Sequence, residues 1–245
     1  MQAMILAAGL GTRLRPLTQG YPKALICLAG RPLLQIALDV CIRAGFTEIA
    51  VNAHHHADQI AAFLSRWPKP DDVELHLSQE PELLNTGGGI KRMAAAAGYE
   101  GPVLVHNVDV VSNIDLNRLA KIHCDSGADV TLATLSCQSE RALLFDGRDQ
   151  LVGYRTRGQR ILTASTPQKP VRELEFCGIQ VIDPRLFLSR PGAVFSSIDL
   201  YLRSAGEGAE VRSCSADGRY WLDLGSPERL RRAEEDIRTG RFKLP

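Results

Sequence analysis

The sequence lacks a long apolar run. No stretch of its 245 residues approaches the roughly 20 consecutive apolar residues that cross a bilayer. Its N-terminus also lacks the basic segment followed by an apolar one that marks a signal peptide. We therefore expect a cytoplasmic protein that does not bind membranes. With 44% hydrophobic and 23% charged residues the composition is ordinary for a globular protein, and its length is sufficient for a sizeable core.

Excess charge and metal-binding cysteine patterns are missing too. A net charge of +1 gives no attraction of the whole molecule to nucleic acid, so we expect the basic residues to act locally on a small anion. The six cysteines include no Cys-x-x-Cys pair and no zinc spacing, which predicts reduced, mostly buried thiols. Three adjacent histidines, 54–56, cannot all face one ion, so we do not expect them to bind a metal.

The chain does have a glycine-rich basic loop directly after an apolar start. Met4–Ala7 is typical of a buried parallel strand. Gly9 and Gly11 then allow backbone N–H groups to approach an anion closely. The polar and basic residues that follow are Thr12, Arg13, Arg15 and Lys23. Because guanidinium groups bind phosphate oxygens bidentately, this loop predicts a polyphosphate site.

Two common phosphate loops do not fit this spacing. A dinucleotide fingerprint requires a third glycine where this chain has Leu14, and a Walker loop requires Gly-Lys-Ser/Thr where Thr12-Arg13 follows Gly11. The remaining alternative without a ligand is an ordinary strand–turn–helix with a basic surface.

Strand and helix patterns alternate after the loop. Helical spacing predicts helices over 33–44, 58–67 and 115–126, and apolar runs predict strands over 48–52, 73–77 and 129–135. Such alternation implies parallel strands with right-handed crossovers and a ligand beyond their carboxyl ends. We therefore expect a single Rossmann-like α/β domain over residues 1–245, with a mixed, mostly parallel central sheet flanked by helices.

Two further segments carry polar groups toward this edge. The strand predicted over 103–110 is apolar until Asn107 and Asp109, which aims a carboxylate into the crevice. The segment 79–89 ends in three glycines before a helix predicted over 90–97. There the backbone can lie flush against a base or a phosphate, and free N–H groups favour polar ligands.

The second half of the chain is less regular. Residues 136–175 are more polar and show several short strand patterns without a clean linker, so we expect a lobe inserted into the sheet domain. Phe176–Ile182 predicts another apolar strand, with Gly178 where a sugar ring can approach. Residues 188–219 show no clear pattern. Ser226 as N-cap and a proline after it predict a last helix to about Thr239.

Several of these motifs together resemble the signature of the sugar-1-phosphate nucleotidylyltransferases. They are Leu6-Ala7-Ala8-Gly9-Leu10-Gly11-Thr12-Arg13-Leu14-Arg15-Pro16-Leu17-Thr18, Pro22-Lys23, Gly30-Arg31-Pro32-Leu33, Thr86-Gly87-Gly88-Gly89, Asn107-Val108-Asp109 and Trp221-Leu222-Asp223-Leu224-Gly225-Ser226-Pro227. The likeness covers nearly the whole chain. It implies a GT-A-like nucleotidyltransferase domain, with nucleotide bound by residues 1–135, and with the sugar phosphate and a C-terminal helix in residues 136–245.

The resemblance also implies roles for individual residues. Arg13 and Lys23 would be catalytic, by holding the departing phosphates and by stabilising charge on the α-phosphoryl group. The nucleotide-binding set would be Leu6, Ala7, Ala8, Gly9, Gly11, Thr12, Arg13, Lys23, Glu80, Thr86, Gly87, Gly88 and Asn107. Asn107, Lys169 and Gly178 would bind the sugar phosphate, and Asp109 and Asp223 would bind Mg²⁺. The chain departs from the family pattern at three positions. The family has Glu in place of Asn85, Gly or Ala in place of Val108, and Glu in place of Gln168.

The implied reaction is attack by a sugar-1-phosphate oxygen on the α-phosphorus of a nucleoside triphosphate, with release of pyrophosphate. The short length and the Thr-Gly-Gly-Gly stretch most resemble the N-acetylmuramate-1-phosphate uridylyltransferases, which favours UTP and a place in cell-wall amino-sugar recycling. Hexose- or heptose-1-phosphate guanylyltransferases are the next alternative, and phosphocholine cytidylyltransferases the third. A non-catalytic nucleotide-binding regulatory protein on the same fold is the alternative from another class. We expect a monomer or a weak homodimer.

Overall fold

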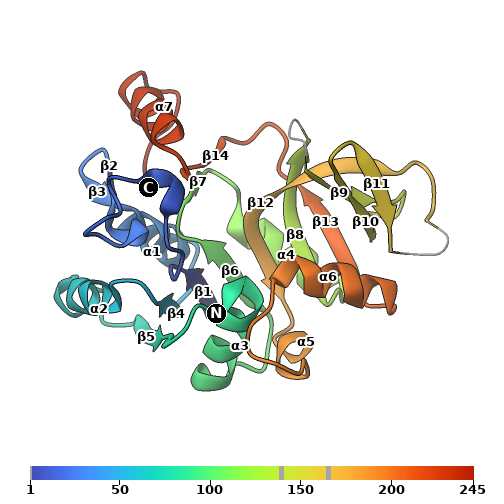
Figure 1. Ribbon diagram of the computed structural model, residues 1–245, viewed down its shortest axis with the longest axis horizontal. Coiled ribbons are helices and arrows are strands. Elements are labelled where there is room, and N and C mark those ends of the chain that lie inside the picture. The colour runs from blue at the N-terminus through green and yellow to red at the C-terminus, as the bar shows by residue number, and fades with distance from the viewer. Residues whose placement is uncertain (1, 138–140, 164–166) are drawn as a thin grey trace.

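The computed structural model describes residues 2–137, 141–163 and 167–245. Its strands in the main sheet are β1 (Gln2–Leu6), β4 (Glu48–Ala53), β5 (Glu74–Gln79), β6 (Val103–Asn107), β8 (Val130–Ser136), β9 (Ala142–Phe145), β10 (Leu151–Thr156), β11 (Gln159–Leu162), β12 (Arg172–Ile182) and β13 (Val211–Ser215). Over these described residues they form a ten-stranded sheet in the order β11-β10-β9-β12-β6-β1-β4-β5, with β8 paired to β12 and β13 (Figure 1).

The sheet changes direction at β12. Strands β5, β4, β1 and β6 run parallel, whereas β12 lies antiparallel to β6, β8 and β9, and β9, β10 and β11 pair as antiparallel neighbours. The parallel strands end together, because Leu6 is the register partner of both Asn52 and Asn107. The expected edge with polar strand ends therefore exists, and the prediction of one α/β domain with a mixed sheet is confirmed.

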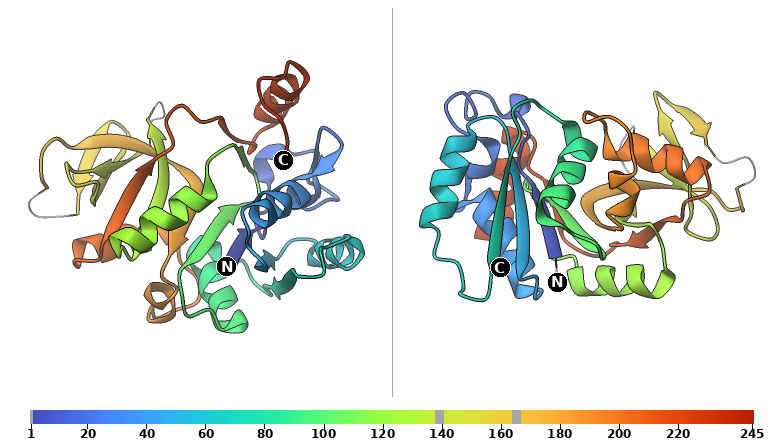
Figure 2. Two further views of the ribbon diagram at one scale, coloured as in Figure 1. Left: turned by 180° about the vertical axis from the view of Figure 1, so that it is seen from behind. Right: turned by 90° about the horizontal axis from the view of Figure 1, so that it is seen from below.

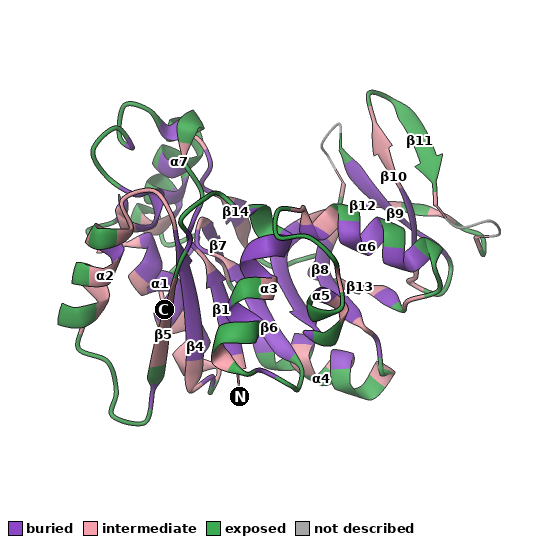
Figure 3. Cartoon of the chain, turned by 60° about the horizontal axis from the view of Figure 1, so that its bottom comes forward, coloured by how far each residue is buried: buried purple, intermediate pink, exposed green. Residues whose placement is uncertain are grey.

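Helices cover both faces of the sheet (Figure 2). They are α1 (Leu33–Arg43), α2 (Ala57–Arg66), α3 (Asn85–Ala97), α4 (Leu116–Ser126), α5 (Arg185–Leu188), α6 (Ser197–Gly206) and α7 (Pro227–Arg238), with the 3₁₀ turns η1 (Thr12–Leu14) and η2 (Lys23–Leu25). Alternate residues of β1 point to opposite faces, so Ala3 and Ile5 join one hydrophobic core and Met4 the other. The central strands are buried between these layers, while β11 is exposed (Figure 3).

Two short ribbons lie outside the main sheet. One pairs β2 (Cys27–Leu28) with β3 (Arg31–Pro32), and the other pairs β7 (Val110–Ser112) with β14 (Trp221–Asp223). The prediction of one strand over 103–110 is therefore wrong at its end, because the chain turns after Asn107 and starts β7 at Val110. This turn allows a segment from near the C-terminus to pair beside the carboxyl end of β6.

Other predictions also need correction at particular residues. Helix α3 begins at Asn85 rather than at residue 90, and the unpatterned stretch 188–219 contains α6 and β13. The last helix is confirmed, since the Ser226 side chain accepts a hydrogen bond from the Arg229 amide at 3.3 Å. Among the helices of the described residues, none is both long enough and apolar enough to span a membrane.

The prediction that most of the cysteines are buried is wrong. Only Cys41 and Cys177 are buried, and burial raises the pKa of each thiol to about 12. The others are exposed or half-buried.

Candidate functional site

The glycine-rich loop after β1 is closed by contacts within itself. Gly11 adopts a φ of +62°, and a Cβ there would lie 2.8 Å from Cγ2 of Thr18. The Thr18 hydroxyl donates a hydrogen bond to the Gly11 carbonyl at 2.9 Å. Gly9, by contrast, faces open space. Glycine is therefore required at position 11 by the left-handed backbone and the tight packing.

A cavity of about 220 Å³ lies at the carboxyl ends of β1, β4 and β6. Residues predicted from the sequence that line it are Leu6, Ala7, Ala8, Gly9, Lys23, Glu80, Thr86, Asn107 and Asp109. Asn52, Leu83, Asn85 and Val108 also line it. The predicted residues that lie outside this lining are Gly11, Thr12, Arg13, Gly87, Gly88, Lys169, Gly178 and Asp223. Its position is the one at which parallel α/β sheets bind ligands.

Lys23 and Asp109 are two of the charged residues that line this cavity, and Glu80 is a third. Lys23 lies in η2 with only 9% of its surface exposed, and its Nζ forms an ion pair with Asp109 Oδ2. Asp109 lies in the turn between β6 and β7. Without a ligand, the ammonium and the carboxylate therefore compensate each other in a nearly buried setting.

The β7–β14 ribbon brings Asp223 to the same place. Asp223 is the register partner of Val110, and the Leu224 amide donates to the Asp109 carbonyl at 2.8 Å. The Asp223 carboxylate accepts a hydrogen bond from the Gly225 amide at 2.6 Å. Residues 114 positions apart in the sequence thus meet through backbone pairing.

Arg13 reaches this junction from the first loop. A Cβ at Gly225 would lie 2.5 Å from Arg13 Nη2 and 2.6 Å from Asp223 Oδ1, so both side chains occupy the space beside this glycine. Arg229 Nη1 lies 3.6 Å from the same Asp223 oxygen. The Asp223 carboxylate therefore lies near the guanidinium groups of Arg229 and Arg13.

The donor set of Asp109 and Asp223 fits a magnesium ion. Mg²⁺ in nucleotide enzymes is held by one or two carboxylates together with phosphate oxygens and water. The two side chains are 17% and 29% exposed, so a ligand can reach them. Within the described ranges, no group of three or more His, Cys, Asp or Glu side chains could hold a metal. Any bound Mg²⁺ would thus depend on oxygens from the substrate.

The Thr-Gly-Gly-Gly segment makes protein contacts. The amides of Gly87 and Gly88 donate to the Phe195 carbonyl at 2.9 and 3.2 Å, and the Thr86 hydroxyl accepts from the Ser197 amide at 3.0 Å. The expectation that these glycine amides are free for a ligand is wrong, because α3 begins at Asn85 and packs against the segment before α6. Asn85 itself has a φ of +60° and lines the cavity.

A second cavity of about 1080 Å³ is lined by residues from both halves of the chain. Its charged lining includes Arg13, Glu175, Arg203, Asp223 and Arg229. Burial is the largest effect on Glu175 and raises the pKa of its carboxyl, while the Arg229 charge opposes that shift. Arg13 and Asp223 belong to this lining, and neither of them lines the first cavity.

Gly178 lies beside Asn107 at an irregularity of β12. Its φ is +72°, and a Cβ would lie 2.8 Å from Asn107 Nδ2 and 3.0 Å from Cγ2 of Val110. A side chain at 178 would therefore displace Asn107. Next to Asn107, His106 is buried, and burial lowers its pKa to about 4, so its ring is neutral.

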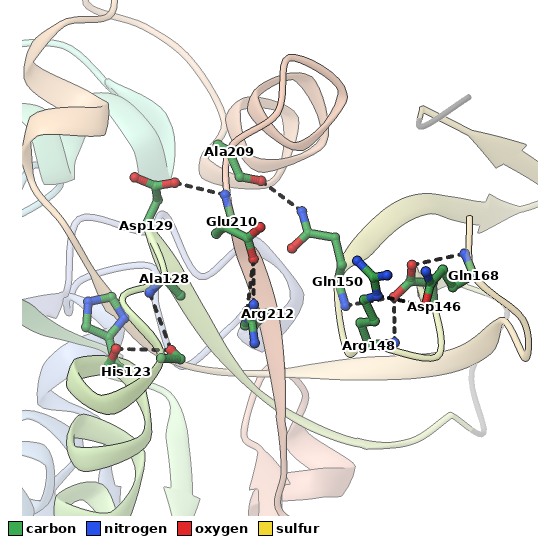
Figure 4. Close-up of polar contacts among 11 residues, drawn as sticks. His123, Ala128, Asp129, Asp146, Arg148, Gln150, Gln168, Ala209, Glu210 and Arg212 are labelled. Atoms are coloured by element: carbon green, nitrogen blue, oxygen red, sulfur yellow. Dashed lines mark hydrogen bonds and ion pairs between the residues drawn. The ribbon is translucent and has the colours of Figure 1, made fainter. Parts of the chain in front are cut away.

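Lys169 lies apart from both cavities. The carbonyl of its neighbour Gln168 accepts a hydrogen bond from the Gly147 amide at 2.8 Å, and the Gln168 amide donates to Asp146 at 3.1 Å. Figure 4 shows Gln168 beside Asp146 and Arg148 at the β9–β10 turn. Lys169 therefore belongs to the exposed end of the lobe and is not brought together with the other predicted residues.

Asn52 is the main residue that the sequence analysis missed. It is the penultimate residue of β4, and Asn107 is the last residue of β6, so both place a polar amide near the carboxyl end of a largely apolar strand. That shared position was a usable signal. Its side chain accepts a hydrogen bond from the Ala7 amide at 2.6 Å and lines the first cavity.

Comparison with known proteins agrees with this geometry. Residues 2–145 match the nucleotidyl transferase family. The chain is 33% identical over 242 residues to the N-acetylmuramate alpha-1-phosphate uridylyltransferase of Caulobacter vibrioides, with 95% of each chain covered. It is 29% identical to the mannose-1-phosphate guanylyltransferase catalytic subunit beta of Drosophila melanogaster, over 93% of this chain and 60% of that protein.

The fold is also found among solved structures. The UDP-glucose pyrophosphorylase from Acinetobacter baumanii superposes with a TM-score of 0.77 at 16% sequence identity, over 99% of this chain and 95% of that chain. At this identity the likeness concerns the fold.

Proposed function

The chain belongs to the nucleotidyl transferase family and is an enzyme of the sugar-1-phosphate nucleotidyltransferase type, and we propose that it transfers a uridylyl group from UTP with the help of Mg²⁺. The acceptor would be a sugar 1-phosphate, and the second product pyrophosphate. The observation that carries this proposal is the Lys23–Asp109 ion pair at the carboxyl ends of the parallel strands, with the segment of Asp223 paired to the backbone beside Asp109.

The reaction requires positioning and charge neutralisation, with no nucleophilic side chain. Lys23 is placed to stabilise negative charge that develops on the α-phosphoryl group, once a substrate draws it from Asp109. Arg13, beside Gly225, would hold the departing phosphates. Asp109 and Asp223 would hold Mg²⁺, which when bound neutralises phosphate charge.

The two cavities suggest a division of the substrates. The cavity lined by Ala7, Ala8 and Gly9 would hold the nucleotide, as part of a nucleotide-binding region over residues 1–135. The larger cavity would hold the sugar phosphate, as part of residues 136–245. Arg13 and Asp223 line the larger cavity, and the backbone next to Asp223 is bonded to Asp109 of the first, so these two residues would then stand between donor and acceptor.

UTP and N-acetylmuramate 1-phosphate are the proposed substrates, because the Caulobacter relative that carries those substrates in its name aligns over 95% of both chains. That acceptor would place the enzyme in amino-sugar recycling. A guanylyl donor is the second candidate, favoured by the 29% identity to the Drosophila mannose-1-phosphate enzyme. A cytoplasmic location and a monomer or weak homodimer stay predictions.

A pyrophosphate-release assay tests this proposal. The purified chain is incubated with each of UTP, GTP, CTP and dTTP, and with each of N-acetylmuramate, mannose and glucose 1-phosphate, with MgCl₂ or with EDTA. We expect release that depends on MgCl₂ and is fastest with UTP. Faster release with GTP would replace uridylyl by guanylyl transfer, and no release with any pair would contradict the proposed function.

A further inference from the structure

The first cavity has two walls that come from different parts of the chain. One wall is the loop that leaves β1 at Ala7. The other is the segment from Glu80 to Asn85, which leads from β5 into α3. Strand β4 lies between β1 and β5 in the sheet, and its last polar residue, Asn52, faces this gap.

A continuous chain of hydrogen bonds crosses from one wall to the other. The Ala7 amide donates to Asn52 Oδ1 at 2.6 Å, and Asn52 Nδ2 donates to Glu80 Oε1 at 2.6 Å. The second carboxylate oxygen, Oε2, accepts from the Leu84 amide at 3.3 Å. Asn52 and Glu80 are only 2% and 4% exposed, so water contributes little to holding them.

The chemistry of the partners determines how the Asn52 amide is oriented. A backbone N–H can only donate, so the atom facing Ala7 must be the side-chain oxygen. The NH₂ group then faces Glu80, which as a carboxylate can only accept. Aspartate at position 52 would instead place two carboxylates against each other in a buried site.

Gly89 gives independent support for the importance of this contact. It lies inside α3, where alanine is ordinarily more stable than glycine. A Cβ there would lie 2.6 Å from Asn52 Nδ2 and 2.8 Å from Glu80 Oε1. Helix α3 therefore packs directly on the Asn52–Glu80 hydrogen bond, and this bond occupies the space of a side chain at 89.

We propose that Asn52 and Glu80 are positioning residues, which set the spacing between the phosphate-side wall at Ala7 and the opposite wall at Leu84. The proposal rests on the proposed function in one respect, namely that this cavity binds the nucleotide. It also means that the Ala7 amide is engaged by Asn52, so the loop donors for phosphate come from the residues after Ala7. Glu80 then acts through its protein contacts.

An exchange of donor and acceptor tests the proposal. Asn52→Asp replaces the donor to Glu80 by an acceptor, and Glu80→Gln leaves one of its two hydrogen bonds unmade. In the double variant the new aspartate accepts from Ala7 and from the glutamine NH₂, while the glutamine oxygen accepts from Leu84. All three hydrogen bonds are then restored, and only the one between positions 52 and 80 is reversed in direction. Asn117→Asp, on the exposed side of α4, is the control for the added charge.

The measurements are the melting temperature without ligand, the affinity for UTP with MgCl₂ by calorimetry, and KM and kcat. We expect Asn52→Asp to melt at lower temperature and to bind UTP at least about tenfold more weakly, because a buried acceptor faces another acceptor. The double variant should recover to within about threefold of wild type, and Asn117→Asp should match wild type. A double variant no better than Asn52→Asp would contradict the proposed bridge, which is the hydrogen-bonded connection Ala7–Asn52–Glu80–Leu84. If the nucleotide contacted these side chains directly, the second substitution would not restore binding.

Gly89→Ala tests the same contact from the helix side. An ordinary helical site would gain about 1 kcal/mol from this change. If α3 packs on the bridge, the variant should instead melt at lower temperature and show the UTP defect of Asn52→Asp. A higher melting temperature would contradict the proposal. The ligand-free melting data test the bridge even if wild type binds no nucleotide, an outcome that would instead refute the proposed function.

Discussion

The first cavity and the lobe formed by β9, β10 and β11 are stabilised by different polar contacts. In the cavity, Asn52 and Glu80 form hydrogen bonds within a buried network. In the lobe, β11 is exposed along its whole length, and Glu173 pairs with arginines such as Arg160, whose side chain is 55% exposed. An unsatisfied buried polar group costs about 1–3 kcal/mol, while an exposed ion pair contributes about 0–1 kcal/mol. Substitutions of polar residues in the first cavity should therefore lower the stability of the protein more than substitutions in the lobe do.

The largest expected effect comes from the two carboxylates that would hold the metal. Asp109→Asn and Asp223→Asn should each lower Mg²⁺-dependent turnover by about 10²–10³-fold, and the double variant should lose little more, because residues that act as a unit are not additive. Turnover is measured over a range of MgCl₂ concentrations, with the exposed Asp125→Asn of α4 as control.

The two carboxylates should differ in stability. Asp109→Asn leaves the nearly buried Lys23 ammonium without its counter-ion, so it should lower the melting temperature more than Asp223→Asn does. Additive losses of activity in the double variant would show that the two side chains do not share one ion.

Two lysines sharpen the comparison between the regions. Lys23→Ala removes a charge from the first cavity and should reduce kcat by about 10²–10³-fold. Lys169→Ala removes the same charge from the lobe, where the lysine is exposed and lines neither cavity, so we expect kcat and KM to stay at wild-type values. A lower kcat or a higher KM in Lys169→Ala would support a role for Lys169 in binding the sugar phosphate. It would also reduce the expected difference between the two regions.

Two glycines of the first loop show whether the backbone conformation at a position, and not the loss of a glycine as such, determines stability. Gly11→Ala places a side chain at a φ of +62° and 2.8 Å from Thr18, so unfolding should be easier by at least about 1–2 kcal/mol. Gly9→Ala enters open space and should leave the melting temperature near wild type. Equal melting temperatures for the two variants would show that the loop is not held as described. Both are compared by thermal unfolding without ligand.

The smallest effect is expected in the lobe. Arg160→Ala should destabilise the protein by less than about 1 kcal/mol, since Arg155 still pairs with Glu173 at 2.8 Å. Hydrogen bonding from Arg160 is the largest cause that lowers the pKa of Glu173. A lowered carboxyl pKa stabilises the fold above the ordinary value of 4.5 and loses that effect as the pH falls. The difference between variant and wild type in melting temperature should therefore be present at pH 7 and shrink below pH 4.5.

Much of the first half of the chain could be predicted because local sequence and final contacts agree there. The residue types alone predict the apolar strand before Gly9 and the left-handed backbone conformation at Gly11. Asn52 was missed because its partners, Ala7 and Glu80, are 45 and 28 positions away, and no local spacing reports such pairs. The loop interpretation of Gly87 and Gly88 failed because Phe195, whose carbonyl accepts their amides, is remote in the sequence.

The second half could be predicted less well for a related reason. Helix α6 begins at Ser197 and is capped by Ser196. Its buried residues Leu200 and Tyr201 pack in the core on the face that carries α3, and the local sequence does not show this packing. Strand β14 has three residues and no partner near it in sequence, so its pairing with β7 was not visible. Short strands and capped helices without strong periodicity are determined mainly by tertiary contacts.

The β7–β14 ribbon also determines when, during synthesis of the chain, the proposed catalytic centre can be assembled. Arg13 and Asp109 emerge from the ribosome well before Trp221–Asp223, and only these last residues pair the segment of Asp223 with the backbone beside Asp109. A nascent chain can therefore form the parallel strands and the first cavity while its pair of aspartates is still unassembled. Translation that stops before Trp221 would leave a fragment without that pair, so the proposed catalytic centre is assembled only late in synthesis.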